Sequence, residues 1–160
     1  MKKALFAGTF DPVTIGHERV IEKISNLFDE VYVSIGVNPN KTPIFSLEAR
    51  LEMLNLVCKK YSNIKVVYNE GLLVDLMKRE GILYNVRGVR NDSDYVYENE
   101  MHFLNEKLYP GMITLFIPCE EKFVNISSTQ VRKAVKNGEN LEAYLSKQVI
   151  DVINKELSKQ

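Results

Sequence analysis

The sequence predicts a doubly wound α/β fold, in which helices cover both faces of one parallel sheet. Five short apolar runs rich in β-branched residues alternate along the chain with segments whose apolar residues recur at helical spacing. Parallel strands in such sheets are joined by right-handed helical crossovers. We expect five strands in the Rossmann-like order 3-2-1-4-5, followed by helices at the C-terminal end. The length of 160 residues fits a single domain, 1–160.

The predicted elements follow from local signals. Capping residues open the helices, and Gly or Pro-Gly ends them. Thr14 is expected to cap the first helix and Ser46 the second, whose predicted buried face is Leu47, Leu51, Leu54, Cys58 and Tyr61. The strands are expected at 4–7, 31–37, 64–68, 83–86 and 113–117. The helices are expected after Thr14, with apolar residues of one face from Val20 to Phe28, from Ser46 to Tyr61, at 72–79, at 94–108 and, broken at Gly138, after Ser127.

Composition narrows the class of protein. Lys plus Arg and Asp plus Glu both number 21, so the formal net charge is zero. General binding to nucleic acid or to a membrane surface needs a basic excess, and neither is expected. Cys58 and Cys119 are the only cysteines, and the chain has no secretory signal or long apolar span. A cytoplasmic location with free thiols is the expectation.

The stretch from Gly8 to His17 joins the first strand to the first helix, where open α/β sheets bind phosphate groups. With Thr14 as the cap, His17 lies in the first helical turn. The helix dipole favours its neutral form, which still donates one hydrogen bond. Neither a P-loop nor a dinucleotide fingerprint is present. The alternative is that Gly8, Pro12 and Gly16 only shape a turn.

A second polar cluster, Arg87-Gly88-Val89-Arg90, ends the fourth strand. In the order 3-2-1-4-5 the first and fourth strands flank the switch point, so this cluster and residues 8–11 meet in the ligand crevice. Arginine forks match phosphate oxygens. The alternative is two surface arginines paired with nearby carboxylates, namely Asp92, Asp94 or Glu98.

A third segment, residues 125–132, places hydroxyls at a helix start. Ser or Thr at that position caps a helix, while the free backbone N–H groups of the first turn donate hydrogen bonds to a phosphate. A plain N-cap is the alternative.

These three segments carry a family resemblance over essentially the whole chain. Residues 8–17 match G-T-F-D-P-x-T-x-G-H, a form of the nucleotidyltransferase signature, residue for residue. Residues 126–132 are similar to its second signature, I-S-S-[ST]-x-[VI]-[RK]. Residues 84–98 resemble the Y-x-x-R-G-x-R and D-Y-x-Y-E pattern of phosphopantetheine adenylyltransferases. The segment Phe123-Val124-Asn125 departs from the usual aromatic-Ser-Phe approach.

The resemblance implies a role for each matched residue. The residues that it assigns to ATP are Thr9, Phe10, His17, Gly88, Val89, Arg90, Glu98, Phe123, Val124, Asn125, Ile126, Ser127, Ser128 and Thr129. Those that it assigns to the acceptor are Thr9, Lys41, Leu73 and Arg87. His17, Lys41 and Arg90 are the expected catalytic donors. Asp11 either orients its neighbours or lies near a metal, no residue is assigned as a metal ligand, and His102 is expected to be a surface or satisfied histidine.

The implied reaction is reversible transfer of AMP from ATP to 4′-phosphopantetheine, giving dephospho-CoA and pyrophosphate. The acceptor phosphate is already ionised, and no Ser-His-Asp or Cys-His set calls for a covalent intermediate, so direct in-line attack is expected. Mg²⁺ is expected with the triphosphate, CoA as a feedback inhibitor, and a homohexamer. The alternatives are a nicotinamide mononucleotide adenylyltransferase and a non-catalytic nucleotide- or CoA-binding sensor. Cytidylyltransferases carry the string R-T-x-G-I-S-T-T, whereas this chain has Lys122-Phe123-Val124-Asn125-Ile126 at that place, so a cytidylyltransferase is not expected.

Overall fold

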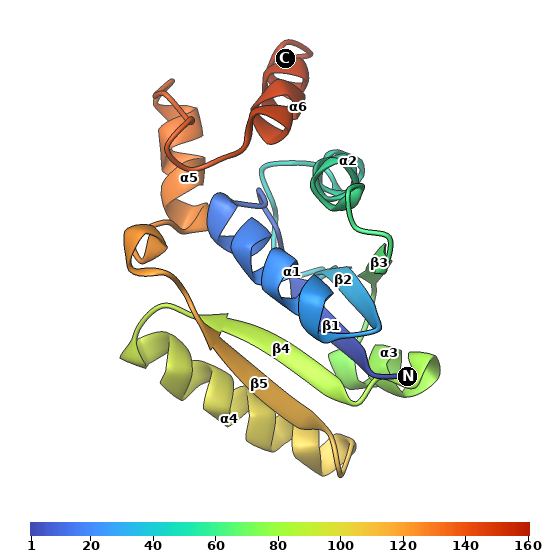
Figure 1. Ribbon diagram of the computed structural model, residues 1–160. Coiled ribbons are helices and arrows are strands. Elements are labelled where there is room, and N and C mark those ends of the chain that lie inside the picture. The colour runs from blue at the N-terminus through green and yellow to red at the C-terminus, as the bar shows by residue number, and fades with distance from the viewer.

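Five parallel strands form one sheet in the order β3-β2-β1-β4-β5 in the computed structural model, which describes residues 1–160 (Figure 1). The strands are β1 (Lys3–Gly8), β2 (Glu30–Gly36), β3 (Ile64–Asn69), β4 (Tyr84–Val89) and β5 (Ile113–Pro118). The predicted fold class and strand order are confirmed. The fourth strand is longer than predicted, because Arg87, Gly88 and Val89 continue the ladder against β5.

Six α-helices and one 3₁₀ turn connect and follow the strands. They are α1 (Ile15–Leu27), α2 (Leu47–Cys58), α3 (Leu73–Glu80), α4 (Asp92–Leu108), η1 (Glu121–Phe123), α5 (Ser128–Lys136) and α6 (Lys147–Leu157). Thr14 and Ser46 cap α1 and α2 as predicted. Helix α4 begins two residues earlier than predicted, because the side chain of Asn91 caps it by accepting from the Asp94 amide.

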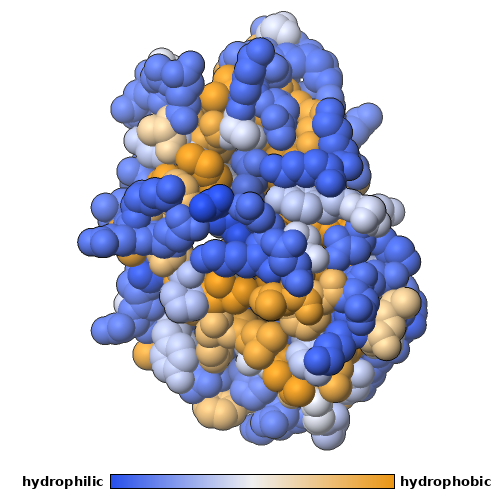
Figure 2. Space-filling view, viewed as in Figure 1, coloured by the Kyte–Doolittle hydropathy of each residue, from blue (hydrophilic) through white to orange (hydrophobic).

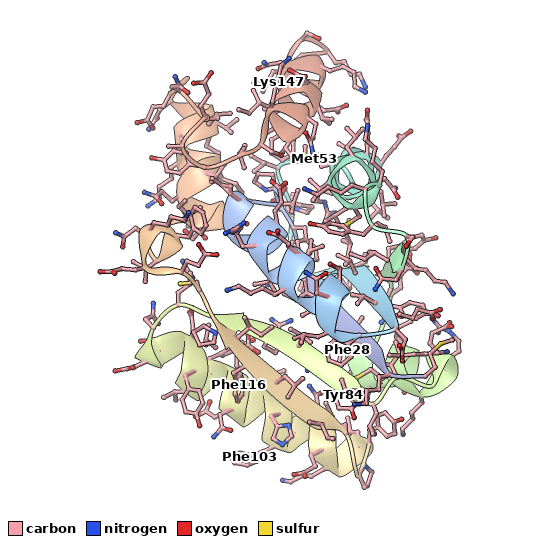
Figure 3. The ribbon with its side chains drawn as sticks, in the orientation of Figure 1. Phe28, Met53, Tyr84, Phe103, Phe116 and Lys147 are labelled. Atoms are coloured by element: carbon pink, nitrogen blue, oxygen red, sulfur yellow. The ribbon has the colours of Figure 1, made fainter.

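The helices cover the sheet in two layers. Helices α1, α2, α5 and α6 pack on one face, and α3 and α4 lie on the other (Figure 1). Each face of the sheet has a hydrophobic core, and successive side chains of a strand point to opposite faces. Ala4 and Phe6 of β1 therefore lie in the larger core, with α1, α2, α5 and α6, and Leu5 lies in the smaller core, with α3. Phe28, at the end of α1, packs on Tyr84 of β4 with ring centroids 5.3 Å apart (Figure 3).

The predicted buried face of α2 is only partly right. Leu54 and Cys58 are buried, whereas Leu47, Leu51 and Tyr61 only flank the core. The fully buried positions also include Ala49, Met53 and Val57, because α2 packs against both the sheet and α6 and so presents a wide face.

Helix α4 and strand β5 leave apolar surface uncovered. No residue of α4 is buried, and Val96, Phe103 and Leu104 are each more than half exposed. On β5, Thr114 and Phe116 contact α4, so Ile113, Leu115 and Ile117 face the opposite side by alternation. Figure 2 shows apolar residues gathered on that side, in the lower half of the view where β4 and β5 lie. We call Ile113, Leu115 and Ile117 the β5 patch. No helix is long and apolar enough to span a bilayer.

Candidate active site

A cavity of about 350 Å³ opens at the carboxyl ends of β1 and β4, at the switch point of the sheet. The turn after β1, the first turn of α1, the end of β4 and the start of α5 all contribute to it. The predicted site residues that line it are Thr9, Phe10, His17, Arg87, Gly88, Val89, Arg90, Glu98, Phe123, Ile126, Ser127, Ser128 and Thr129. Three segments that are far apart in the sequence therefore meet in one crevice.

His17 is held by a reciprocal cap at the start of α1. Its backbone N–H donates to Oγ1 of Thr14, and its Nδ1 accepts from the Thr14 backbone N–H at 2.9 Å. Because Nδ1 is an acceptor, the proton of the neutral ring lies on Nε2. The ring also packs edge-on against Phe10, with centroids 5.0 Å apart. His17 therefore offers one hydrogen-bond donor of fixed orientation.

The protonation state of His17 is set by its surroundings. Burial of the ring, followed by the positive charges of Arg87 and Arg90, lowers the pKa of His17 from 6.5 to about 4. The neutral form predicted from the sequence is therefore confirmed, but burial rather than the helix dipole is the main cause.

Arg87 lies between β1 and α4 and is fully paired. Its Nε and Nη2 donate to the two carboxylate oxygens of Glu98 at 2.8 and 2.9 Å, and its Nη1 donates to the carbonyl oxygen of Ala7. Arg90 pairs with Asp94, whose Oδ2 accepts from Nε and from the Arg90 backbone N–H at 3.1 Å each. Both arginines thus line the cavity, as a phosphate-binding cluster would, and both are paired with carboxylates, as the alternative interpretation expected. The two interpretations of this segment are therefore compatible.

The start of α5 is fixed against the turn after β1. Ser127 caps the helix by accepting from the Gln130 backbone N–H, and Oγ of Ser128 donates to the carbonyl oxygen of Pro12 at 2.9 Å. Nη1 of Arg132 donates to the carbonyl oxygen of Asp11 at 3.0 Å. The helix N-terminus consequently faces the cavity with its free N–H groups, as a phosphate site requires.

A second cavity of about 450 Å³ adjoins the first. It is lined by Gly36, Val37, Asn38, Pro39, Gly71 and Leu73 and by four residues that also line the first cavity, namely Ala7, Gly8, Thr9 and Arg87. The predicted acceptor residues Thr9, Leu73 and Arg87 therefore lie together, separated from the α5 side of the site by the end of β1.

Three predicted site residues line neither cavity. Lys41 is exposed on the loop after β2, and its side chain makes no hydrogen bond or ion pair. Val124 and Asn125 follow η1 and are absent from both linings, although their neighbours Phe123 and Ile126 line the first cavity. The departure from the family pattern falls on these two residues.

The hydrogen bonds of His102 and Asp11 show what these two side chains do. Nδ1 of His102 is 2.7 Å from Oγ1 of Thr114, so His102 is a satisfied histidine, as predicted. Asp11 accepts from the backbone N–H groups of Ile44 and Phe45, which confirms that it orients its neighbours. The side chains of the chain hold no group of three or more His, Cys, Asp or Glu arranged to bind a metal ion.

Sequence reasoning gave no role to several residues that line the cavities. Arg132 belongs to the second signature, over residues 126–132, and Asn38 and Pro39 belong to the Asn- and Pro-rich stretch that precedes Lys41, so the sequence carried a signal for all three. Cys119 lines the first cavity because it follows β5 at the same edge of the sheet as the ends of β1 and β4.

Comparisons with known proteins agree with this geometry. Residues 5–134 match the family model described as cytidylyltransferase-like. The chain is 38% identical to the phosphopantetheine adenylyltransferase of Clostridium novyi over 97% of both chains, and 41% identical to that of Dictyoglomus turgidum over 86% of both. A solved nicotinic acid mononucleotide adenylyltransferase of Plasmodium falciparum, complexed with NaAD, shares the fold with a TM-score of 0.69. Its identity is 23%, with 97% of this chain and 96% of that one covered.

The fold, the crevice and the matched signatures define a nucleotidyltransferase of the cytidylyltransferase-like class. Within that class, the chain belongs to the phosphopantetheine adenylyltransferase family.

Proposed function

We propose that this protein transfers AMP from ATP to 4′-phosphopantetheine, giving dephospho-CoA and pyrophosphate in coenzyme A biosynthesis. One observation carries the proposal: two cavities share Ala7, Gly8, Thr9 and Arg87 as a common wall. Group transfer between two substrates needs this arrangement, because the reacting atoms must come within about 3–3.5 Å of each other. The names and identities of the relatives supply the choice of acceptor.

In the proposed arrangement ATP occupies the first cavity. Gly88, Val89 and Arg90 and the start of α5 receive the nucleotide and its phosphates, and the acceptor phosphate enters from the second cavity beside Arg87 and Thr9. An acceptor phosphate oxygen forms the new bond to the α-phosphorus, and the bond from that phosphorus to the bridging oxygen breaks, releasing pyrophosphate. Nε2 of His17 and the cation of Arg90 stabilise the negative charge that develops on the α-phosphoryl oxygens. Lys41 adds a further cation from its loop.

Mg²⁺ belongs to this reaction as part of the ATP substrate. Mg²⁺ commonly keeps several waters and binds through substrate phosphates with few protein carboxylates, so a site without a cluster of metal ligands suits it. We also propose a cytoplasmic location, in keeping with two cysteines that are both free, and CoA as a feedback ligand of the same crevice.

We further propose a homohexamer. The uncovered face of α4 and the β5 patch offer apolar surface on both sides of an edge strand. Ile113 is exposed, and Leu115 and Ile117 are only partly buried, so a single chain leaves part of this surface in contact with water. Burial between subunits would remove that cost.

The direct test measures pyrophosphate release with ATP and candidate acceptors. We expect release with 4′-phosphopantetheine, and far less with nicotinamide mononucleotide or when CTP replaces ATP. Comparable or faster turnover with either alternative rejects the assignment, and binding of ATP and CoA without turnover identifies a sensor. ATP chirally labelled with sulfur at the α-phosphorus should give inversion, whereas retention would mean an adenylylated enzyme.

A further inference from the structure

Two charged residues, Asp11 and Arg50, are buried beside the site without lining either cavity. Their exposed fractions are 3% and 5%. Buried charges are costly unless they are paired and hydrogen-bonded, so each needs a compensating set of partners. Arg50 lies in the first turn of α2, four residues after its cap, and the family resemblance assigns it no role.

Asp11 joins the turn after β1 to the end of the loop that carries Lys41. Its Oδ2 accepts from the Ile44 backbone N–H at 3.0 Å, and its Oδ1 accepts from the Phe45 backbone N–H at 3.1 Å. One carboxylate therefore fixes two successive backbone amides of the segment that leads from Lys41 into α2.

Arg50 joins the same two segments from the other side. Its Nε donates to the carbonyl oxygen of Phe45 at 3.1 Å, and its Nη1 donates to the carbonyl oxygen of Thr9 at 3.0 Å. Asp11 and Arg50 thus hold the backbone at Phe45 through its N–H and its C=O respectively. The carboxylate of Asp11 and the guanidinium of Arg50 therefore lie near each other, one on each side of Phe45. Their attraction offsets part of the free energy that burying the two charges costs.

The backbone that Arg50 grips is the part of the turn that faces both substrates. Thr9 lines both cavities, and the next residue, Phe10, has a left-handed φ of 48° and packs its ring against His17. A left-handed φ is unfavourable for a residue as bulky as Phe, so the surrounding contacts must maintain the turn. The hydrogen bond from Arg50 to the Thr9 carbonyl lies directly before that residue.

We propose that Arg50 and Asp11 are positioning residues for the transfer step, holding Thr9 between the two substrates and the Lys41 loop beside the acceptor cavity. This inference rests on the proposed function. Neither side chain lines a cavity, and both act through the backbone of Thr9, Ile44 and Phe45.

The test compares Arg50→Met and Arg50→Lys with Val57→Ala, a matched control. Val57 is 1% exposed and lies two turns further along α2. We expect Arg50→Met to lower kcat about 100-fold, the loss that a displacement of about 1 Å causes, with the Kd of ATP changed less than threefold. Arg50→Lys keeps the charge but lacks the fork, so we expect a loss of about tenfold. Val57→Ala should lower the Tm and leave kcat unchanged.

Hydrogen exchange provides a readout that is independent of turnover. In Arg50→Lys and Asp11→Asn we expect faster exchange in residues 8–12 and 38–46, and unchanged exchange in α4. Arg50 variants that keep the wild-type kcat while their Tm falls as in Val57→Ala would overturn the proposal, as would unchanged exchange in both segments. If the wild type transfers AMP to no acceptor, the proposed function fails, and the exchange measurement alone decides whether the two residues hold these segments.

Discussion

Arg87 and Glu98 form a two-point ion pair at the wall between the two cavities, with N···O distances of 2.8 and 2.9 Å. A third hydrogen bond, to the Ala7 carbonyl oxygen, ties the same guanidinium to the end of β1. Parallel hydrogen bonds of this kind fix the plane of the guanidinium. The side chain proposed to meet the acceptor phosphate is therefore oriented before any ligand enters, which lowers the entropic cost of binding.

The first prediction concerns Arg87. In Arg87→Ala the acceptor KM should rise at least tenfold, because a hydrogen bond to a charged group is worth about 1.5–3 kcal/mol. The substitution also leaves Glu98 without its partner, and because the two side chains are only partly buried, at 25% and 12% exposure, the loss of stability should lie between that of a surface pair and that of a buried one. The double variant Arg87→Ala/Glu98→Gln should recover the Tm but not the KM. Recovery of both would make Arg87 a purely structural residue.

The second prediction is that His17 acts on the transition state. A donor aimed at developing charge is worth about 2.7–4 kcal/mol, or roughly 10²–10³ in kcat. His17→Ala should lose that factor while the circular dichroism spectrum and the Kd of ATP stay close to those of the wild type. A variant that keeps most of its kcat would leave His17 only the role of capping α1 with Thr14.

The third prediction follows from the pKa of His17, which lies near 4 in the folded protein against 6.5 for an ordinary histidine. Between these values the unfolded chain binds a proton that the folded protein excludes, so stability falls as the pH drops from 6.5 to 4. One pKa unit equals about 1.4 kcal/mol, so a difference of about 2.5 units gives a loss of at most about 3.5 kcal/mol. His17→Asn should show a shallower decline of the unfolding free energy between pH 7 and pH 5. Equal slopes would mean that His17 titrates normally.

The fourth prediction separates Lys41 from its surroundings. Because the Lys41 side chain is exposed and unpaired, Lys41→Ala should leave the Tm almost unchanged, as most surface substitutions do. If its ammonium group meets the phosphates after its loop moves, kcat/KM for the acceptor should fall at least tenfold. Lys59→Ala, another exposed lysine at the far end of α2, should not change kcat/KM. Equal activity in both variants would remove Lys41 from the catalytic set.

The fifth prediction concerns assembly. Ile113→Glu places a charge in the β5 patch and should lower the solution mass, measured by light scattering, from about six times 18.4 kDa to that of smaller species. Leu157→Glu on α6 is the matched control, because the two side chains are similarly exposed, at 39% and 42%. Ile113→Glu protein that keeps the wild-type mass would exclude the β5 patch as an interface.

Much of the fold follows from local sequence signals. The five β-branched runs, the capping residues Thr14 and Ser46 and the stop at Gly81 act within one or two turns of the chain, so their effects can be predicted from neighbouring residues. The buried face of α2 was less predictable. It depends on α6, which comes about ninety residues later and has no local signal in α2 itself.

The candidate site divides in the same way. The sequence alone determined the three signature segments and their place at strand ends and helix starts, because each depends on residue type and local geometry. It also predicted a neutral His17, but from the helix dipole, whereas burial of the ring in the folded chain is the main cause. Only the tertiary structure decided that Arg87 pairs with Glu98, that Lys41 lies outside both cavities and that Arg50 holds the Thr9 carbonyl. The contacts of Arg87 and Arg50 join residues that are 11 to 80 positions apart in the sequence. In the sequence, a charged side chain has many oppositely charged or polar residues as possible partners. Only the packed backbone brings one of them within hydrogen-bond distance.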